Sequence, residues 1–284
     1  MNKPKLLITM GCSHTEGFGC WDENTFPNEM KDKIEGLKNE DIFFYLNRHD
    51  KNFENLQNSI TKKNMSRFHL NGWPMNLAQS MRFDKLINLG RGGSSNSGQV
   101  KLFFENNLHK NPYKEYDVLL IWQLTEPFRI SFYLDKKIVN LMNEREEIFG
   151  SYFKRVIKDK SFELDNIIEP ILESIFYFKI IESICEKNNW KMIGFDFLQR
   201  NSTLFNRLYE TPNFYGCGIT KQMQKSGEWE RNRSKVCGHL NENGYKILTK
   251  YIYNFIKDNN LFEIGTNRGK IDMEYLGNPI EHKL

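Results

Sequence analysis

The sequence contains no run of about 18 consecutive apolar residues, so it offers no candidate for a membrane-spanning helix. It also lacks a Pro-, Gly- or Ser-rich stretch that would mark a linker between two domains. Its five cysteines are an odd set without close spacing, which argues against a disulfide framework. The first apolar run, residues 6–10, is too short for the core of a signal peptide. We therefore expect a protein of the reducing cytoplasm.

An excess of charge of one sign is also lacking. The formal net charge is +4 over 284 residues, and positive and negative side chains are interspersed. This pattern favours a mixed, solvated surface over a nucleic-acid-binding surface. With 39% hydrophobic residues the chain can bury a large core. We expect a single domain over residues 1–264, with insertions near 22–70 and 133–166, and a polar C-terminal tail over 265–284.

Four short apolar runs alternate with segments that have helical patterns. The runs are residues 5–10, 86–89, 118–122 and 191–197, and the clearest helical patterns cover 71–83, 167–190 and 239–260. Strands that alternate with helices predict βαβ units and a parallel central sheet between two helical layers. We expect both insertions to be helical or irregular. In such a sheet, ligands bind beyond the carboxyl ends of the strands.

The segment "GCSHTEG", residues 11–17, follows the first predicted strand and places a serine at that edge of the sheet. Ser13 is a poor nucleophile without a base. His239 is the best-placed candidate, because it lies in the loop before the last predicted helix and imidazole suits general-base work. The glycines of "NLGRGGSSN" carry N–H groups that can approach an oxyanion closely. Together these residues predict acyl-transfer chemistry.

Three blocks of the sequence resemble the SGNH (GDSL-like) hydrolase superfamily. "GCSHTEG" is similar to the first block of that family, "NLGRGG" to the second and "GHLNENG" to the last. The resemblance implies that Ser13 is the nucleophile, Gly93 an oxyanion-hole residue and His239 the base. It also implies a flavodoxin-like three-layer α/β/α sandwich that hydrolyses esters, often of acylated sugars or lipids, without a metal or another cofactor. It does not cover the two insertions.

The chain departs from the family pattern at two places. The third block has "WQLTEPFR" in place of an asparagine, with Gln123, Thr125 and Glu126 nearby. We predict Thr125 as the substitute donor, because a carboxylate at Glu126 would repel a developing oxyanion. No acid stands just before His239. A backbone carbonyl or a distant acid such as Asp196 is therefore expected to orient the imidazole.

Substrate contacts are expected at the same edge of the sheet. His14 is predicted to be a rim contact and not the base, because neighbouring residues of an extended segment point apart. Arg129 follows the third strand and could contact an anionic group of the substrate. Gly92 and Asn96 belong to the glycine-rich segment and complete the predicted contacts.

Two functional hypotheses follow. The first is a serine esterase or deacylase that acts on a small-molecule or glycan ester, for which a carbohydrate O-acetyl ester is the leading substrate class. The alternative is a catalytically inactive SGNH-like module with a binding or structural role, which the two departures motivate. A zinc site built from Cys12, His14, Cys237 and His239 is a weaker alternative, since their spacing matches no standard zinc module.

Overall fold

A sheet of six parallel strands, in the order β7-β6-β3-β1-β2-β8, lies at the centre of the computed structural model. The structure describes residues 3–28, 30–32, 53–125, 130–134, 137–141, 164–196, 213–215, 219–234 and 236–277. The strands are β1 (Lys5–Met10), β2 (Lys85–Asn88), β3 (Asp117–Leu124), β6 (Lys191–Asp196), β7 (Phe214–Tyr215) and β8 (Asp272–Tyr275). The predicted α/β class with a parallel central sheet is confirmed.

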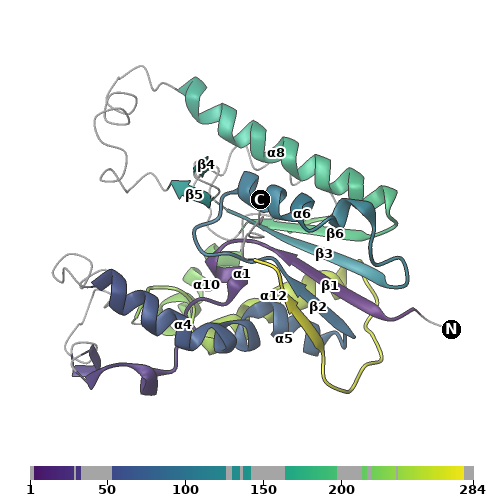
Figure 1. Cartoon of the computed structure of the whole chain (residues 1–284). Coiled ribbons are helices and arrows are strands. Elements are labelled where there is room, and N and C mark those ends of the chain that lie inside the picture. The colour runs from purple at the N-terminus through teal and green to yellow at the C-terminus, as the bar shows by residue number, and fades with distance from the viewer. Residues whose placement is uncertain are drawn as a thin grey trace.

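Helices cover both faces of the sheet (Figure 1). One layer contains α4 (Phe53–Asn71), α5 (Trp73–Ser80) and α12 (Glu242–Asp258), and the other contains α6 (Asn96–Glu105) and α8 (Leu164–Lys187). Two buried apolar clusters lie between the layers. Leu7 belongs to one cluster, and Leu6 and Ile8 belong to the other. Because successive strand residues point to opposite faces, a strand covered on both faces has a nearly continuous apolar run.

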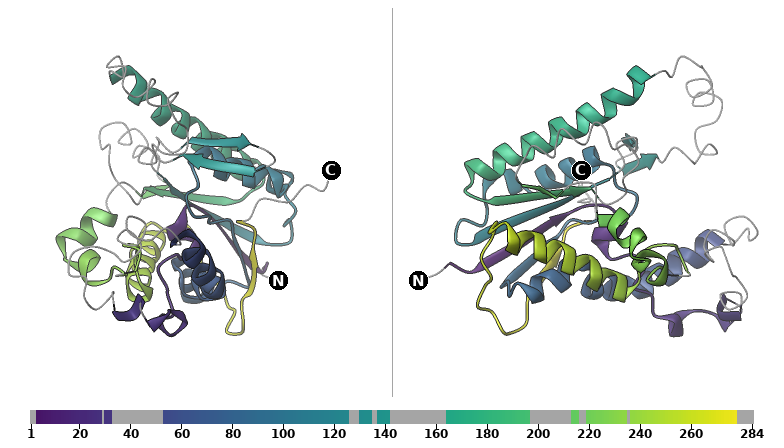
Figure 2. Two further views of the ribbon diagram at one scale, coloured as in Figure 1. Left: turned by 60° about the vertical axis from the view of Figure 1, so that its left-hand side comes forward. Right: turned by 180° about the vertical axis from the view of Figure 1, so that it is seen from behind.

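The remaining elements are short. The helices are α1 (Ser13–Glu16), η1 (Glu23–Thr25), η2 (Leu108–Lys110), α10 (Ile219–Lys225) and α11 (Glu228–Arg231). Figure 2 shows α10 on the same side of the sheet as α12, away from α8. No helix in the described ranges has the length and the apolar character needed to cross a bilayer.

The second predicted insertion begins with strands. β4 (Ile130–Leu134) and β5 (Lys137–Leu141) form an antiparallel pair, where a charged, helix-prone segment was expected from residue 133. Both strands carry β-branched or aromatic residues, which favour strands over helices. In this stretch the strand preference of those residues outweighs the helical pattern of the charged ones.

The expected C-terminal tail contributes a strand to the sheet. β8 pairs in parallel with β2, and Tyr275 stands opposite Asn88. Nζ of Lys85, in β2, lies 3.3 Å from Oδ2 of Asp272 and 3.4 Å from Oε2 of Glu274, both in β8. The side chains of an edge strand are less deeply buried than those of a central strand, so four mostly polar residues can form β8. For that reason the polar composition of 265–284 did not predict a strand.

The order of the strands places the first loop at a change of direction in the sheet. The chain passes from β1 to β2 on one side, and then returns to β3 on the other side of β1. The helices that follow β1 and β2 consequently cover opposite faces (Figure 1). Ligands of open α/β sheets bind at this kind of switch point, beyond the carboxyl ends of the strands. Ser13 follows β1 and Thr125 follows β3 at that position.

Candidate active site

The structure brings the predicted nucleophile and base together. Ser13 is the first residue of α1, and its Oγ lies 2.7 Å from Nε2 of His239, which is 226 positions away in the chain. Nδ1 of His239 lies 3.0 Å from the backbone carbonyl oxygen of Cys237. A carbonyl can only accept, so Nδ1 carries the hydrogen and Nε2 accepts the hydroxyl proton of Ser13. Both side chains are partly exposed, which leaves them accessible to a substrate.

A tight loop sets the orientation of His239. The N–H of Ser234 donates to the carbonyl of His239 at 2.7 Å, and the N–H of Gly238 donates to the carbonyl of Ser234 at 3.0 Å. Gly238 has a φ of 69°, in the left-handed region that favours glycine. This loop turns the carbonyl of Cys237 toward the imidazole. The backbone carbonyl of Cys237 is thus the first of the two alternative orienting groups that the sequence analysis expected. The second alternative, Asp196, is the last residue of β6 and stands opposite Leu124 of β3.

Aromatic rings pack against the imidazole on one flank of Ser13. We call His14, Phe18, Trp229 and Tyr245 the base side. The ring centroids of His14 and Phe18 lie 4.7 Å and 5.1 Å from that of His239. The hydroxyl of Tyr245 donates to the carbonyl of Phe18 at 2.6 Å and lies 3.3 Å from Nδ1 of His14. Trp229 completes the base side, with its ring centroid 6.2 Å from that of His14.

His14 does not lie at the rim, where it was expected. Its side chain is only 5% exposed and packs between the imidazole of His239 and the helix α12. The reason is that α1 already begins at Ser13. Successive residues of a helix are about 100° apart and do not point in opposite directions. His14 is thereby directed into the interior while Ser13 stays accessible.

The glycine-rich segment forms a turn on the other flank of Ser13. The N–H of Ser94 donates to the carbonyl of Arg91 at 3.1 Å, and Gly93 takes the third position of the turn with a φ of 72°. A Cβ built on Gly92 would lie 3.9 Å from Cβ of Ser13, so the turn abuts the serine. Neither the N–H of Ser13 nor that of Gly93 has an acceptor within the described ranges. Both remain available to an oxyanion.

Asn88, at the end of β2, joins three segments around this turn. Its Nδ2 donates to the carbonyl of Thr15 at 3.0 Å, and its Oδ1 accepts from the N–H of Gly90 at 2.8 Å and from Oγ1 of Thr9 at 3.1 Å. A Cβ on Gly90 would lie 2.5 Å from the backbone nitrogen of Glu16. The backbones of the turn and of α1 are therefore in direct contact, and only glycine fits between them.

Glu16 is a buried carboxylate three residues after Ser13, with 8% exposure. Its Oε2 accepts from the N–H of Gly92 at 2.7 Å, and its Oε1 accepts from the hydroxyl of Tyr275 at 3.1 Å. Burial raises the pKa of Glu16 above its ordinary value, and these two hydrogen bonds and the charge of Arg91 oppose that rise. We call the turn and its supports, Glu16, Asn88, Gly90–Gly93 and Tyr275, the turn side.

Thr125, expected as a third oxyanion donor, and Asn96, expected as a substrate contact, are hydrogen-bonded to each other. Oδ1 of Asn96 accepts from the N–H of Thr125 at 2.8 Å, and its Nδ2 donates to the carbonyl of Thr125 at 3.2 Å and to Oγ of Ser174 at 3.0 Å. Asn96 is only 3% exposed, so it supports the end of β3 and does not face a substrate. The N–H of Thr125 is therefore engaged with Asn96, and Thr125 as a substitute oxyanion donor stays a prediction.

Gln123 stands near the position where the family has its asparagine. It is fully buried, and its Oε1 accepts from the hydroxyl of Thr15. Its Nε2 lies 3.5 Å from Sγ of Cys12, on the other side of the serine. Gln123 thus supports the backbone on both sides of Ser13 from the interior. Gln123 therefore has a structural role in this segment.

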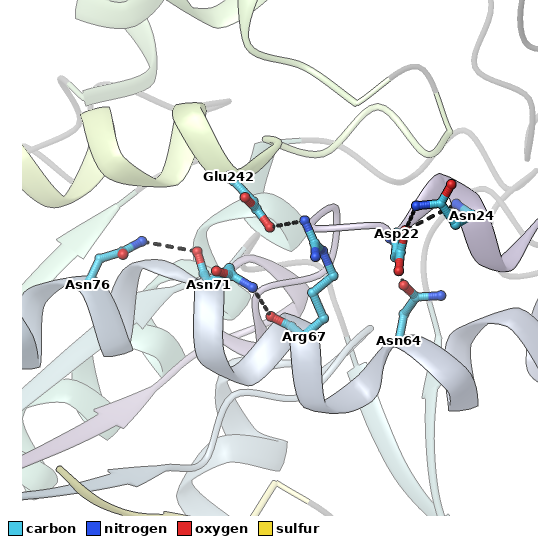
Figure 3. Close-up of polar contacts among 7 residues, drawn as sticks. All are labelled: Asp22, Asn24, Asn64, Arg67, Asn71, Asn76 and Glu242. Atoms are coloured by element: carbon cyan, nitrogen blue, oxygen red, sulfur yellow. Dashed lines mark hydrogen bonds and ion pairs between the residues drawn. The ribbon is translucent and has the colours of Figure 1, made fainter. Parts of the chain in front are cut away.

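The helix α4, in the first predicted insertion, braces the segments that carry the serine and the histidine. Nη2 of Arg67 lies 2.5 Å from Oε1 of Glu242, which is in the first turn of α12 just after the histidine loop (Figure 3). Oδ1 of Asn64 accepts from the N–H of Asp22 at 2.7 Å, in the loop that follows the serine segment. The described part of the insertion that contains α4 therefore belongs to the scaffold of the site.

Two residues that the sequence analysis considered at this edge, Arg129 and Glu126, lie outside the described residues. Within the described ranges no three His, Cys, Asp or Glu side chains gather as a metal ion would require, so the four residues considered as zinc ligands do not form such a site.

The sequence reasoning missed Glu16, Asn88 and Tyr275. Glu16 and Asn88 lie inside the blocks "GCSHTEG" and "NLGRGG", so their fixed spacing from Ser13 and Gly93 was a usable signal. Tyr275 follows a polar stretch without an apolar run, and no local pattern distinguishes it.

Comparisons with known proteins assign no family to the chain: no protein-family model matches it, and no curated protein does. Its function is therefore inferred from the site itself.

Proposed function

We propose that this protein is an SGNH-type serine esterase or deacylase that hydrolyses an acyl ester through Ser13 and His239. The observation that carries the proposal is the 2.7 Å separation of Ser13 Oγ and His239 Nε2, with the 3.0 Å contact of Nδ1 to the Cys237 carbonyl. A hydroxyl, a correctly protonated base and an orienting group are the parts that nucleophilic serine catalysis requires. The order β2-β1-β3-β6-β7 adds support, since flavodoxin-like sheets have that order.

In the first half of the reaction, Oγ of Ser13 attacks the ester carbonyl carbon while Nε2 of His239 accepts the hydroxyl proton. The carbonyl π pair moves to oxygen, and the N–H groups of Ser13 and Gly93 donate to that oxyanion. When the tetrahedral intermediate collapses, Nε2 returns the proton to the leaving alkoxide and an alcohol departs. The acyl group is then an ester of Ser13.

In the second half, His239 takes a proton from a water molecule, and the hydroxide attacks the acyl carbon. Collapse releases the carboxylic acid and returns the proton to Oγ of Ser13, so the enzyme is regenerated. No atom or electron is supplied from outside this cycle except the water. The partly exposed position of Ser13 and His239 is consistent with the entry of that water.

The carbonyl of Cys237 takes the place of the acid found in a catalytic triad. Replacing the triad acid by an amide lowers kcat by about 10⁴, largely because the imidazole then adopts the wrong tautomer. A carbonyl oxygen is acceptor-only and enforces the correct tautomer, although it stabilises an imidazolium less than a carboxylate does. We therefore expect measurable but slow turnover.

The substrate class is proposed from the resemblance: a small-molecule or glycan O-acyl ester, with acetylated carbohydrates as the first group to assay. p-Nitrophenyl acetate serves as a generic acyl ester for the initial measurement. Release of acetate from O-acetylated sugars then tests the narrower assignment.

The decisive experiment combines turnover with covalent labelling. Wild-type protein is expected to hydrolyse p-nitrophenyl acetate and to be labelled at Ser13 by a fluorophosphonate, as located by peptide mapping. Ser13→Ala should abolish both, and His239→Ala should lower turnover by about 10³-fold or more. Ser80→Ala, at an exposed serine of α5, and His109→Ala, in η2, are matched controls that should leave both readouts unchanged.

Labelling at another serine, or weak turnover that persists in both variants, would exclude the esterase. The alternative, an inactive SGNH-like module that binds a glycan or has a structural role, would then be preferred. Strong, salt-dependent binding to nucleic acid would contradict both hypotheses.

A further inference from the structure

We propose that Glu16, itself held by Tyr275, is a positioning residue that fixes the glycine turn beside Ser13, so that the C-terminal strand β8 is a working part of the site. The effect on catalysis rests on the proposed function. The hydrogen bond by which Glu16 fixes the turn can be measured whether or not the protein is an esterase.

Glu16 is the link between the turn and the helix that carries the serine. It stands one helical turn after Ser13 in α1, and its Oε2 accepts from the N–H of Gly92 at 2.7 Å. The turn is anchored before this point, where the N–H of Arg91 donates to the carbonyl of Gly11 at 3.0 Å. Gly92 itself is exposed to solvent, so packing alone does not hold it. The carboxylate of Glu16 therefore bonds the exposed part of the turn to the helix that carries Ser13, in addition to the bonds made by Asn88 and Arg91.

Tyr275 fixes the carboxylate from the edge of the sheet. Its hydroxyl donates to Oε1 of Glu16 at 3.1 Å, and its ring stacks on that of His69 with centroids 3.8 Å apart. A Cβ on Gly277 would lie 2.3 Å from the carbonyl oxygen of Gly90, so the chain beyond β8 also touches the turn. The last strand thus reaches both the turn and the group that holds it.

The chemistry of the pair favours a carboxylate at position 16. A carboxylate is acceptor-only and can accept from the N–H of Gly92 and the O–H of Tyr275 together. The charge of Arg91 also faces it, whereas burial of Tyr275 raises the pKa of its phenol and keeps it a donor. A glutamine has the same shape but one acceptor oxygen, so its NH₂ must face one of the two donors. Glu16→Gln consequently removes one of these two hydrogen bonds without opening a cavity.

The test compares Glu16→Gln and Tyr275→Phe with a matched pair elsewhere. In α8, the hydroxyl of Tyr177 donates to Glu173 at 2.6 Å, so Glu173→Gln and Tyr177→Phe remove the same type of bond far along the chain from the site. Loss of an oxyanion donor lowers kcat by about 10²–10³-fold, so displacement of the turn should lower it by about 10–100-fold in Glu16→Gln. We expect KM to change by less than about 3-fold, and a smaller loss of kcat in Tyr275→Phe.

Amide hydrogen exchange at Gly92, followed by NMR, reports the hold directly. Exchange should accelerate by about 10-fold or more in both site variants and stay unchanged in the α8 controls, at equal melting temperatures. If neither kcat nor Gly92 exchange moves, the inference is overturned while the esterase stands. If the wild type shows no turnover, the proposed function fails, and Gly92 exchange alone supports or overturns the hold. If Glu16→Gln does not fold, Tyr275→Phe, which removes a single oxygen, carries the test.

Discussion

The two flanks of Ser13 are held by different interactions. On the base side, rings pack around His239, and the imidazole is oriented by shape and by one backbone carbonyl. On the turn side, side-chain hydrogen bonds from Asn88 and Glu16 fix the glycine turn. Packing is spread over many weak contacts, whereas hydrogen bonds are few and directional. The base side should therefore tolerate the loss of one polar atom better than the turn side does.

The largest effect is expected from Asn88→Ala on the turn side. The change removes three buried hydrogen bonds, to Thr9, Thr15 and Gly90, and leaves their partners unsatisfied. The free energy of unfolding, measured in urea, should fall by about 3–5 kcal/mol. Asn106→Ala is the control: its Nδ2 makes one partly buried bond to the carbonyl of Leu102, so about 1 kcal/mol or less should be lost. Equal losses would show that the three bonds of Asn88 contribute no more to stability than one partly buried bond, and that the turn side does not depend on them.

An intermediate effect is expected from Tyr245→Phe on the base side. The ring remains, but the carbonyl of Phe18 and Nδ1 of His14 lose the hydroxyl that they contact. The free energy of unfolding should fall by about 1–3 kcal/mol, while the labelling of Ser13 by a fluorophosphonate should slow by less than about 10-fold. Tyr251→Phe, at a partly buried tyrosine of the same helix with one hydrogen bond to Glu228, should cost less than about 1 kcal/mol. A loss of labelling as large as that of His239→Ala would show that a hydrogen bond, and not packing, orients the base.

The smallest effect concerns the pH dependence of stability and the imidazole of His69, which stacks on the ring of Tyr275. Burial lowers the pKa of His69 from 6.5 to about 4. As the pH falls from 6.5 toward 4, the unfolded chain therefore binds a proton before the folded chain does, and stability is lost. Because His69 is partly exposed, we expect this loss to be about 1–2 kcal/mol.

His69→Phe keeps a ring on Tyr275 but does not titrate, so its stability relative to the wild type should rise over the same window. The raised pKa of Glu16 has the opposite effect on stability, because the folded chain binds that proton before the unfolded chain does as the pH falls. The wild type and His69→Phe both contain Glu16, so this contribution cancels in their difference. Urea unfolding at several pH values measures the difference between them. A difference that does not change with pH would contradict the burial of His69.

The central strands were predictable because they are covered on both faces. Such strands are mostly apolar, and Leu6–Ile8 and Val118–Trp122 have that signature. The strand β8 has one neighbour and four mostly polar residues, so its pairing with β2 follows from the completed sheet and not from its own composition. The hairpin β4–β5 was hidden in a similar way by the charged residues around it.

The sequence by itself determined the core strands, the edge of the sheet at which chemistry is expected, and the choice of Ser13 and His239 as the candidate nucleophile and base. These follow from local patterns and from the rule that parallel strands present their carboxyl ends at one edge. Only the tertiary structure decided that His14 is buried, that Asn96 and Thr125 are engaged with each other, and that Glu16 and Tyr275 meet at the turn. Those outcomes depend on the direction in which each side chain leaves its helix or strand, and on contacts between residues up to 259 positions apart, which local sequence does not encode.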